Sequence, residues 1–301
     1  MASHFTFSPQ KKLSVQVCVM AHNLEDCIQD SLRSLVQAYR PYPARVYVMI
    51  NGCRDNTLQK VQALANELPG ITPVNISLGD KANAWNTFVY EHFDGESIAV
   101  FADGDLTFEK AALANLITYF RAHPNYNAVS GYPYDGGRSA KDWQKQLLEK
   151  HLFTGGLYLM SPVFLERVRK QNIRLPRGLI GDDSMLGYLT ACDLNPPEDD
   201  PMRNIGVCSG AVFRYDSLNP MSRRDIYTYL RRRVRYSMRH FQQSTIVPQL
   251  KQKGLSAMPA TAQELPDITP GLIRWFSGNV VFDLIAYKRL TSHPKTRRRY
   301  S

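Results

Sequence analysis

Two aspartates separated by one glycine, Asp103-Gly104-Asp105, have residue types and spacing suited to chemistry. They follow the apolar run from Ser97 to Phe101, which has the composition of a buried strand. Carboxylate oxygens at positions i and i+2 suit a divalent cation that carries a diphosphate. Asp-Gly is also ordinary turn chemistry, so the tripeptide alone is compatible with a simple bend. The rest of the sequence decides between the two interpretations.

The elements that would position this tripeptide alternate between strands and helices. Apolar residues alternate from Leu13 to Met20, and apolar residues at helical spacing then continue up to Pro41. The unit repeats, which predicts strands at 13–20, 45–50, 71–78 and 98–101 and helices at 24–39, 58–68, 83–93 and 109–123. Such alternation predicts an α/β fold with a parallel sheet and right-handed crossovers.

Polar clusters follow each of the four predicted strands. In a parallel sheet, ligands bind beyond the carboxyl ends of the strands, so the clusters should meet at one rim of the sheet. The alternative is that they are ordinary polar loops. The clusters are Ala21-His22-Asn23, residues 51–55, Gly79-Asp80-Lys81 and Asp103-Gly104-Asp105.

Composition indicates a folded protein of enzyme size. The chain has 301 residues, of which 44% are hydrophobic and 21% are charged, and this suits one principal globular domain. Five cysteines without a C-x-x-C pair favour a reducing compartment and no zinc site. The first twelve residues lack the apolar core of a signal peptide, and no run of about 18 apolar residues occurs. We therefore expect a cytoplasmic protein that does not span a membrane.

Positive charge is concentrated near the C-terminus. The formal net charge is +10, and arginines cluster at 223–239 and again at 289–299. Basic clusters of this kind attract phosphates, nucleic acid or anionic lipid.

Four segments, in the correct order, resemble the motifs of glycosyltransferase family 2, the inverting nucleotide-sugar enzymes of GT-A fold. Residues 19–25 match the opening strand and its P-x-Y-N-E-type turn, and residues 50–57 match D-D-G-S-x-D-x-T. Residues 81–86 match K-G-N-A-L-N, and Asp103-Gly104-Asp105 matches the D-x-D metal motif. Further on, Thr154-Gly155-Gly156 resembles the small-residue turn of the family, and Gly181-Asp182-Asp183 resembles its G-E-D segment. The resemblance extends over roughly residues 13–190.

The resemblance implies a domain arrangement and an activity. Residues 1–217 would form the GT-A domain, a Rossmann-like and mostly parallel sheet flanked by helices, and residues 218–301 a basic, mostly helical extension. The enzyme would move a sugar from a nucleotide-sugar donor to a hydroxyl of a glycan or lipid-linked acceptor, in surface polysaccharide or glycolipid synthesis. A UDP-sugar is the expected donor. Ile50 and Asn51 replace the aspartate with which the family often contacts the base, which leaves the nucleotide open.

Catalytic and metal-binding roles also follow from the resemblance. Asp183 corresponds to the general base, with Asp182 where glutamate is usual. Asp105, and Asp103 directly or through water, would hold Mn²⁺ or Mg²⁺, with His240 as a third ligand. The alternatives are that Asp183 is a helix N-cap and that His240 is an exposed surface residue.

Donor-binding positions carry over in the same way. The eleven expected positions are Ala21, Asn23, Glu25, Asn51, Asp55, Lys81, Asn83, Asp103, Gly104, Arg232 and Arg235. Asn23 and Asp55 also suit helix caps, Lys81 a surface charge and Asn83 a packing role. Arg232 and Arg235 belong to a segment similar to the (Q/R)-x-x-R-W motif of processive synthases, in which Tyr236 replaces the tryptophan. They would bind a diphosphate or an acceptor phosphate, unless the helix is simply a basic surface.

The pattern is less regular after Ser130. Residues 131–142 are predicted as a loop, 157–164 as a strand, and 196–202 as an acidic, proline-rich connection. Helices are predicted at 222–243 and 270–290. Ile273, Phe276, Val280 and Leu284 would form an apolar stripe on the last helix, followed by Lys288-Arg289 and a basic tail. This helix either lies in the surface of an anionic membrane or docks on the enzyme's own core.

Other functions fit the sequence less well. A non-catalytic transferase-like scaffold would bind anionic lipid or nucleic acid through the arginine-rich helix. Such a scaffold would not need Asp103, Asp105 and Asp183 together. Their joint presence therefore argues against this alternative, and no nucleic acid partner is expected. A nucleotidyltransferase would carry a glycine-rich loop after the first strand, and a dehydrogenase a G-x-G-x-x-G motif; neither occurs.

Overall fold

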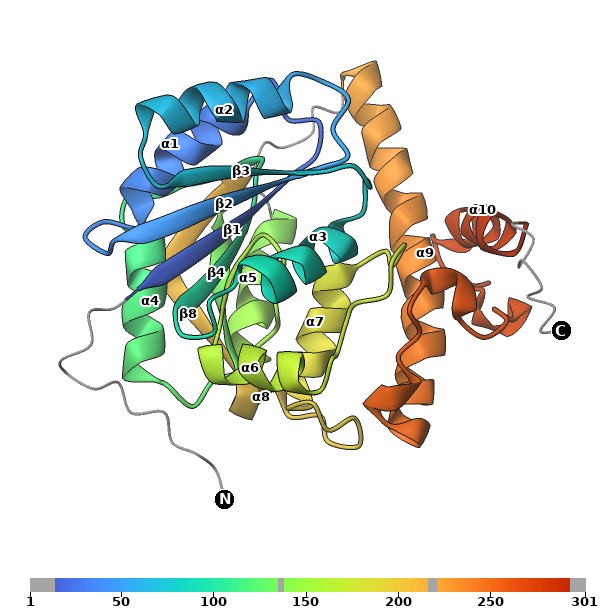
Figure 1. Cartoon of the computed structure of the whole chain (residues 1–301). Coiled ribbons are helices and arrows are strands. Elements are labelled where there is room, and N and C mark those ends of the chain that lie inside the picture. Colours follow the sequence, from blue (N-terminus) through green and yellow to red (C-terminus); the bar gives the residue numbers. More distant parts are fainter. Residues whose placement is uncertain (1–13, 135–137, 216–220, 293–301) are drawn as a thin grey trace, which may run out of the picture.

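A computed structural model describes residues 14–134, 138–215 and 221–292 (Figure 1). The expected domain boundary after residue 217 and the basic residues 295–299 lie outside the described residues.

One eight-stranded sheet forms the centre of the molecule, with the strand order β3-β2-β1-β4-β7-β6-β8-β5. β1 runs parallel to both β2 and β4, and β2 runs parallel to β3, whereas β7 is antiparallel to β4 and β6. The predicted α/β fold with a mostly parallel sheet is therefore confirmed. The strands are β1 Val15–Ala21, β2 Ala44–Asn51, β3 Ile71–Ile76, β4 Ile98–Asp103, β5 Leu106–Phe108, β6 Ala128–Tyr134, β7 Leu157–Met160 and β8 Ile205–Tyr215.

Helices cover both faces of this sheet. One face packs against α1 (Ile28–Ala38), α2 (Thr57–Glu67) and α4 (Ala112–Ala122). The other packs against α3 (Lys81–Thr87), the π-helical turn η1 (Phe88–His92), α6 (Pro162–Lys170) and α7 (Asp182–Ala191). β1 contributes to both layers because its side chains alternate, as predicted: Val15, Val17 and Val19 pack on the first face, and Cys18 and Met20 on the second. Two further helices are α5 (Arg138–Glu149) and α8 (Pro201–Asn204).

Three local predictions are wrong. The first helix begins at Ile28 instead of residue 24, because Asn23 has φ +53° and its side chain accepts a hydrogen bond from the Arg54 amide instead of capping the helix. The predicted loop 131–142 contains the end of β6 and the start of α5, because strand pairing with β8 outweighs its proline and glycine content. The predicted strand 157–164 ends at Met160, and α6 starts with Pro162 at its first position.

The C-terminal part is helical, with different boundaries from those predicted. α9 (Arg223–Lys253) has 31 residues and continues ten residues beyond the predicted end. The predicted last helix is shorter, α10 (Val280–Thr291), and is preceded by short 3-10 turns at Leu255–Ala257, Ala262–Glu264 and Pro270–Leu272. The expected apolar stripe does not form, since Ile273 is buried and Phe276 is fully exposed. α10 lies beside α9 at one edge of the molecule (Figure 1).

Among the described residues, no helix combines the length and the apolar character needed to cross a membrane.

Candidate active site

The acidic tripeptide lies at the carboxyl end of β4, next to the end of β1. Asp103 is the last residue of β4, and its amide donates to the Gly156 carbonyl over 2.9 Å. The Gly104 amide donates to the Met20 carbonyl, also over 2.9 Å, and a Cβ at Gly104 would lie only 2.9 Å from the same oxygen. Glycine therefore allows the tripeptide to turn closely against β1, and Asp105 is exposed beyond the turn.

Lys81 joins two of the expected acidic residues. Its Nζ lies 2.6 Å from Asp103 Oδ1 and 3.6 Å from Asp182 Oδ2. Lys81 is the first residue of α3 and Asp182 the first residue of α7, so three elements meet at this ammonium group. The predicted meeting of the polar clusters at one rim of the sheet is confirmed for the clusters that contain Lys81 and Asp103.

Burial and mutual charge perturb this group of side chains. Burial opposes the charged form of Lys81, but the Asp103 and Asp182 carboxylates outweigh it and hold the pKa of Lys81 above its ordinary value. Burial raises the pKa of Asp103 to about 6, although Lys81 acts in the opposite direction. Burial also raises the pKa of Asp182, again against the effect of Lys81. Shifted acids around one cation are typical of a functional site.

Asp183 lies in the first turn of α7, where Gly181 occupies the N-cap position. The alternative of Asp183 as the N-cap is therefore wrong. Its Oδ1 is 3.5 Å from Arg239 Nη1 of α9, so a residue of the C-terminal helix faces this carboxylate. Gly155 lies so close that a Cβ there would be 2.5 Å from the Asp183 Cβ, which makes the small residue necessary.

The two consecutive acids open onto different cavities. Asp182 lines a cavity of about 880 Å³ together with Lys81 and Arg235. Asp183 lines a cavity of about 550 Å³ whose walls include Trp143 and Tyr188. The start of α7 thus stands between a basic cavity and one with aromatic walls.

Several expected donor-binding side chains hold two loops together. The β1–α1 and β2–α2 loops are joined because Asp55 Oδ2 accepts from the Glu25 amide and Asn23 Oδ1 from the Arg54 amide, while Glu25 Oε2 accepts from Asn56. Burial opposes ionisation of Asp55, but hydrogen bonds from Thr57 and from the Glu25 amide hold the pKa of Asp55 below its ordinary value.

Asn51 and Ala21 are buried at the ends of β2 and β1. Asn51 Oδ1 accepts from the Asp80 amide over 2.7 Å, which joins the end of β2 to the N-cap of α3. His22 Nδ1 lies 2.6 Å from the Asn51 carbonyl. These residues therefore shape the rim from its buried side.

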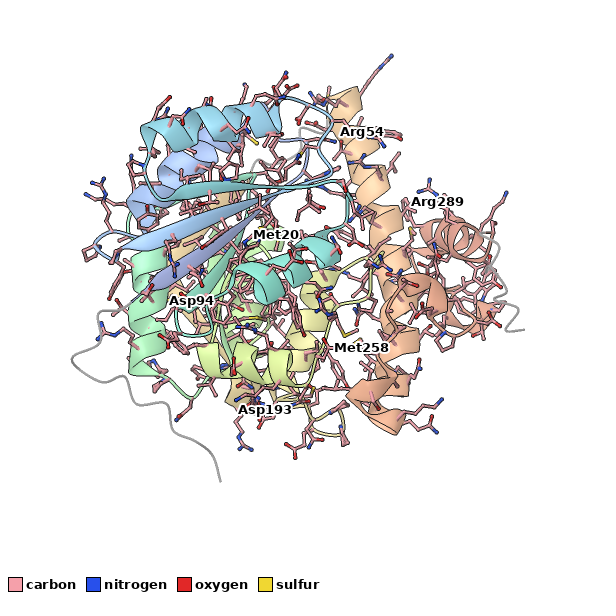
Figure 2. The ribbon with its side chains drawn as sticks, viewed as in Figure 1. Met20, Arg54, Asp94, Asp193, Met258 and Arg289 are labelled. Carbon is pink, nitrogen blue, oxygen red and sulfur yellow. The ribbon has the colours of Figure 1, made fainter. Side chains whose placement is uncertain are left out.

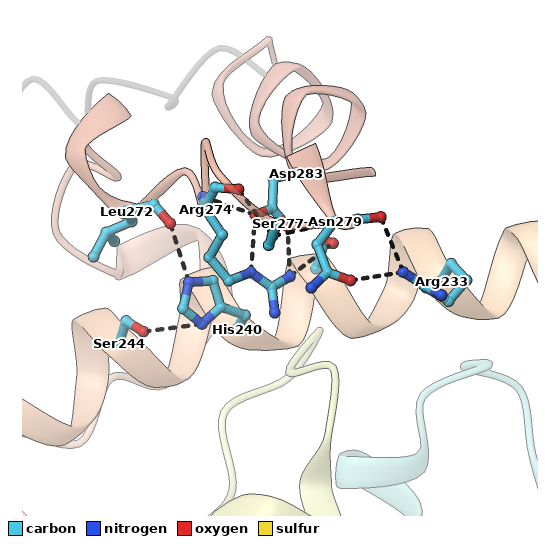
Figure 3. Close-up of polar contacts among 10 residues, drawn as sticks. Arg233, His240, Ser244, Leu272, Arg274, Ser277, Asn279 and Asp283 are labelled. Atoms are coloured by element: carbon cyan, nitrogen blue, oxygen red, sulfur yellow. Dashed lines mark hydrogen bonds and ion pairs between the residues drawn. The ribbon is translucent and has the colours of Figure 1, made fainter. Parts of the chain in front are cut away.

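Other expected site residues lie apart from the acids. Asn83 lines a separate cavity of about 820 Å³ beside Arg174. His240 Nε2 lies 3.1 Å from the Leu272 carbonyl and Nδ1 3.5 Å from the Ser244 hydroxyl, on the face of α9 that holds the C-terminal segment (Figure 3). Arg232 is exposed on α9, one turn before Arg235.

The C-terminal helix supplies a residue that sequence reasoning missed. Arg239 follows Arg235 by four positions and Arg232 by seven, so the three arginines share one face of α9. That spacing was a usable signal. What it could not show was that Arg239 lies against the start of α7, next to Asp183.

The carboxylates alone make a partial cation site. No group of three or more histidine, cysteine, aspartate or glutamate side chains is arranged to hold a metal among residues 14–134, 138–215 and 221–292. Asp103 and Asp105 would therefore supply two oxygen ligands, and this suits a small divalent ion that keeps waters and binds substrate phosphates.

Comparison with known proteins agrees with this geometry. The family model described as "Glycosyl transferase family 2" matches residues 16–178, more than half of the chain. The chain belongs to glycosyltransferase family 2. It is thus a glycosyltransferase, and the resemblance seen in its sequence motifs is confirmed. No curated protein matches the chain by sequence.

Several solved structures share the GT-A fold. A mannosyltransferase from Pyrobaculum calidifontis, in complex with GDP-Man and Mn²⁺, is 20% identical with a TM-score of 0.60, over 95% of this chain and 77% of its own. TarS 1–349 from S. aureus, in complex with UDP-GlcNAc, is 16% identical with a TM-score of 0.51, over 93% of this chain and 91% of its own. Glucosyl-3-phosphoglycerate synthase from Mycobacterium tuberculosis, with Mn²⁺, UDP and phosphoglyceric acid, is 18% identical with a TM-score of 0.50, over 73% and 78%.

Proposed function

We propose that this glycosyltransferase is an inverting enzyme that moves a sugar from a nucleoside diphosphate donor, expected to be a UDP-sugar, to a hydroxyl of a glycan or lipid-linked acceptor. The observation that carries the proposal is the acid pair at the start of α7: Asp182 faces Lys81, which also contacts Asp103, and Asp183 faces a separate cavity. The donor would occupy the cavity that Lys81 lines, and the acceptor hydroxyl would enter the cavity that Asp183 lines.

Asp183 is the proposed general base. As the acceptor oxygen forms its bond to the anomeric carbon, the bond from that carbon to the diphosphate oxygen breaks and the hydroxyl proton passes to the Asp183 carboxylate. Attack from the face opposite the leaving group inverts the anomeric configuration. Gly155 and Arg239 would hold the carboxylate in position, because both lie against it.

The residues on the donor side would stabilise the negative charge of the leaving diphosphate. Asp105 and Asp103 would hold Mn²⁺ or Mg²⁺, and the mannosyltransferase and synthase structures with bound Mn²⁺ support this assignment. A bound divalent ion would neutralise the negative charge that develops on the leaving diphosphate. Lys81, which contacts Asp103, would add a second positive charge beside the leaving diphosphate.

The test is a panel of UDP- and GDP-sugars, with and without Mn²⁺, assayed for nucleoside diphosphate release and for thermal stabilisation. Asp183→Asn should abolish turnover and leave donor affinity within about twofold, since the amide keeps the shape of the side chain but cannot take the proton. If Asp183→Asn retains turnover, Asp183 is not the base. If no donor stabilises the wild-type protein, the donor assignment is wrong.

The acceptor side and the membrane are linked in this proposal. The C-terminal segment exposes Trp275, Phe276, Val281 and Leu284 beside the basic residues Lys288 and Arg289. Exposed apolar side chains with neighbouring cations suit the surface of an anionic bilayer, where lipid-linked acceptors for glycolipid or surface polysaccharide synthesis are found.

Membrane association is tested by cosedimentation with vesicles that contain phosphatidylglycerol. The double variant Phe276→Ser/Val281→Ser should reduce the bound fraction, whereas Met202→Ser, at an exposed methionine on α8, should not. Equal binding of all three proteins would contradict attachment through the C-terminal segment.

A further inference from the structure

Three arginines from separate segments line the 880 Å³ cavity beside Lys81 and Asp182. Arg177 precedes α7, Arg235 lies on α9, and Arg289 lies on α10, next to α9 (Figure 2). Within the described part of the chain, no hydrogen bond or ion pair links their guanidinium groups to a carboxylate. Three cations without carboxylate partners thus converge on one hollow.

Some of the other described arginines are paired with carboxylates, and some are not. The ion pairs include Arg33 with Glu67, Arg45 with Asp94, Arg167 with Asp193, Arg214 with Glu109 and Arg274 with Asp283. What distinguishes Arg177, Arg235 and Arg289 is that all three line one cavity without a carboxylate partner. Cations that share a hollow repel one another unless an anion joins them.

The cavity carries an excess of positive charge. Its lining contains two carboxylates, Asp80 and Asp182, against Lys81 and the three arginines. Asp80 is already engaged, since its Oδ1 accepts from the Asn83 amide at the start of α3 and its Oδ2 from the Gly178 amide over 2.6 Å. Asp182 faces Lys81. The positive charges of the three arginines are therefore not balanced by carboxylates of the cavity lining and are available to an anionic ligand.

The backbone around Arg177 is held on both sides. The Arg177 amide donates to the Ala260 carbonyl over 3.0 Å, and the Ala262 amide donates to the Arg177 carbonyl over 2.8 Å. Gln242 of α9, which is buried, accepts from the Ile180 amide over 2.8 Å. The position of Arg177 thus depends on the C-terminal part of the chain.

Arg289 depends on how α10 is attached to α9. Figure 3 shows the contacts: Arg274 binds Asp283 of α10 through Nε at 2.9 Å and Nη2 at 2.6 Å, and Nη2 also donates to Ser237 of α9. Arg233 of α9 donates to Asn279 Oδ1 over 2.7 Å, just before α10. These contacts fix the helix that carries Arg289 beside the helix that carries Arg235.

We infer that Arg177, Arg235 and Arg289 form a phosphate-binding cavity, built jointly by the GT-A core and the C-terminal helices. Guanidinium groups match phosphate oxygens in bidentate geometry and stay charged when partly buried. The phosphate belongs either to the donor, in which case the inference rests on the proposed function, or to a phosphorylated lipid acceptor. In both cases α9 and α10 are part of the substrate site.

The test measures binding by calorimetry for wild type and for Arg177→Ala, Arg235→Ala and Arg289→Ala. The probes are UDP and GDP with Mn²⁺, inorganic pyrophosphate, and geranyl phosphate with geraniol as its uncharged control. Loss of one charge-assisted hydrogen-bonding group should weaken a phosphate probe by roughly tenfold or more. Lys251→Ala, at an exposed lysine of α9 outside the cavity lining, should stay within about twofold, and circular dichroism checks that each variant folds.

The outcomes are distinct. Weaker binding of UDP or GDP alone supports a donor phosphate, and weaker binding of geranyl phosphate alone supports an acceptor phosphate. The inference is overturned if no arginine variant weakens any phosphate probe, or if Lys251→Ala weakens them equally. If wild type binds pyrophosphate but no nucleoside diphosphate, the proposed donor is wrong and the cavity assignment survives.

Discussion

Asp283 is the buried carboxylate that fastens α10 to the rest of the C-terminal segment, and Asp283→Asn tests whether this contact determines the docking of α10. The wild-type carboxylate is fully buried and accepts from the Arg274 amide over 3.0 Å as well as from the guanidinium group. Asparagine keeps the size of the side chain and removes its charge. The variant therefore isolates the electrostatic part of the contact.

The magnitude follows from the pKa of Asp283. Burial opposes ionisation, but hydrogen bonds from Arg274 outweigh it and lower the pKa of Asp283 from 3.8 to about 2. At 1.36 kcal/mol for each pH unit, this shift corresponds to ~2 kcal/mol of stability at neutral pH. The value is an upper limit because Arg274 is about one third exposed and its charge is partly screened by solvent.

The sign of the pH dependence is fixed by the same shift. Because the folded pKa lies below the unfolded pKa, the contribution is fully present above pH 3.8 and is lost as the pH falls towards 2. Wild type and Asp283→Asn should therefore differ by ~2 kcal/mol at pH 7 and converge near pH 2.

Hydrogen exchange of the amides in α10, followed by mass spectrometry at pH 7, measures this local stability. A loss of ~2 kcal/mol corresponds to roughly thirtyfold faster exchange when opening is local. Asp142→Asn, at an exposed aspartate on α5, is the control and should leave α10 unchanged. Equal exchange of α10 in wild type and Asp283→Asn would refute the electrostatic argument, as would a difference in the free energy of unfolding that persists at pH 2.

Two further predictions concern the acid cluster. Lys81→Met should lower the free energy of unfolding by about 1–2 kcal/mol without metal, because Asp103 loses the ammonium group at 2.6 Å. The variant should also show a larger thermal shift with Mn²⁺, because Lys81 no longer competes with the ion for the Asp103 carboxylate. Equal shifts in both proteins would contradict this competition for Asp103. Gly155→Ala should reduce kcat at least tenfold with nucleotide affinity nearly unchanged, since the new Cβ would displace Asp183. Gly278→Ala, where a Cβ meets nothing within 4 Å, is the matched control, and unchanged kcat in Gly155→Ala would show that Asp183 need not be held in place.

The core of the fold was predictable because its signals are local. Alternating apolar residues in β1 and helical spacing in the segments between strands identified the parallel part of the sheet. The prediction failed at residues 131–142, where pairing of β6 with the distant strand β8 outweighed the turn-forming composition. It also failed at the C-terminal segment, where burial of Ile273 and exposure of Phe276 depend on contacts with α9.

The sequence by itself determined which residues the rim of the sheet would carry, because Asp103-Gly104-Asp105 and Lys81 each follow a strand, and parallel strands end at the same edge. Only the tertiary structure decided how these residues divide their roles. Asn23 and Asp55 hold loops together, and His240 lies against the C-terminal segment.

The tertiary structure alone also brought Arg177, Arg235 and Arg289 to one cavity and Arg239 to Asp183. Their separation along the chain is too large for any local spacing to encode. It is the packing of α9 against α7, and of α10 against α9, that converts scattered arginines into a site, since long-range contacts are set by the fold as a whole.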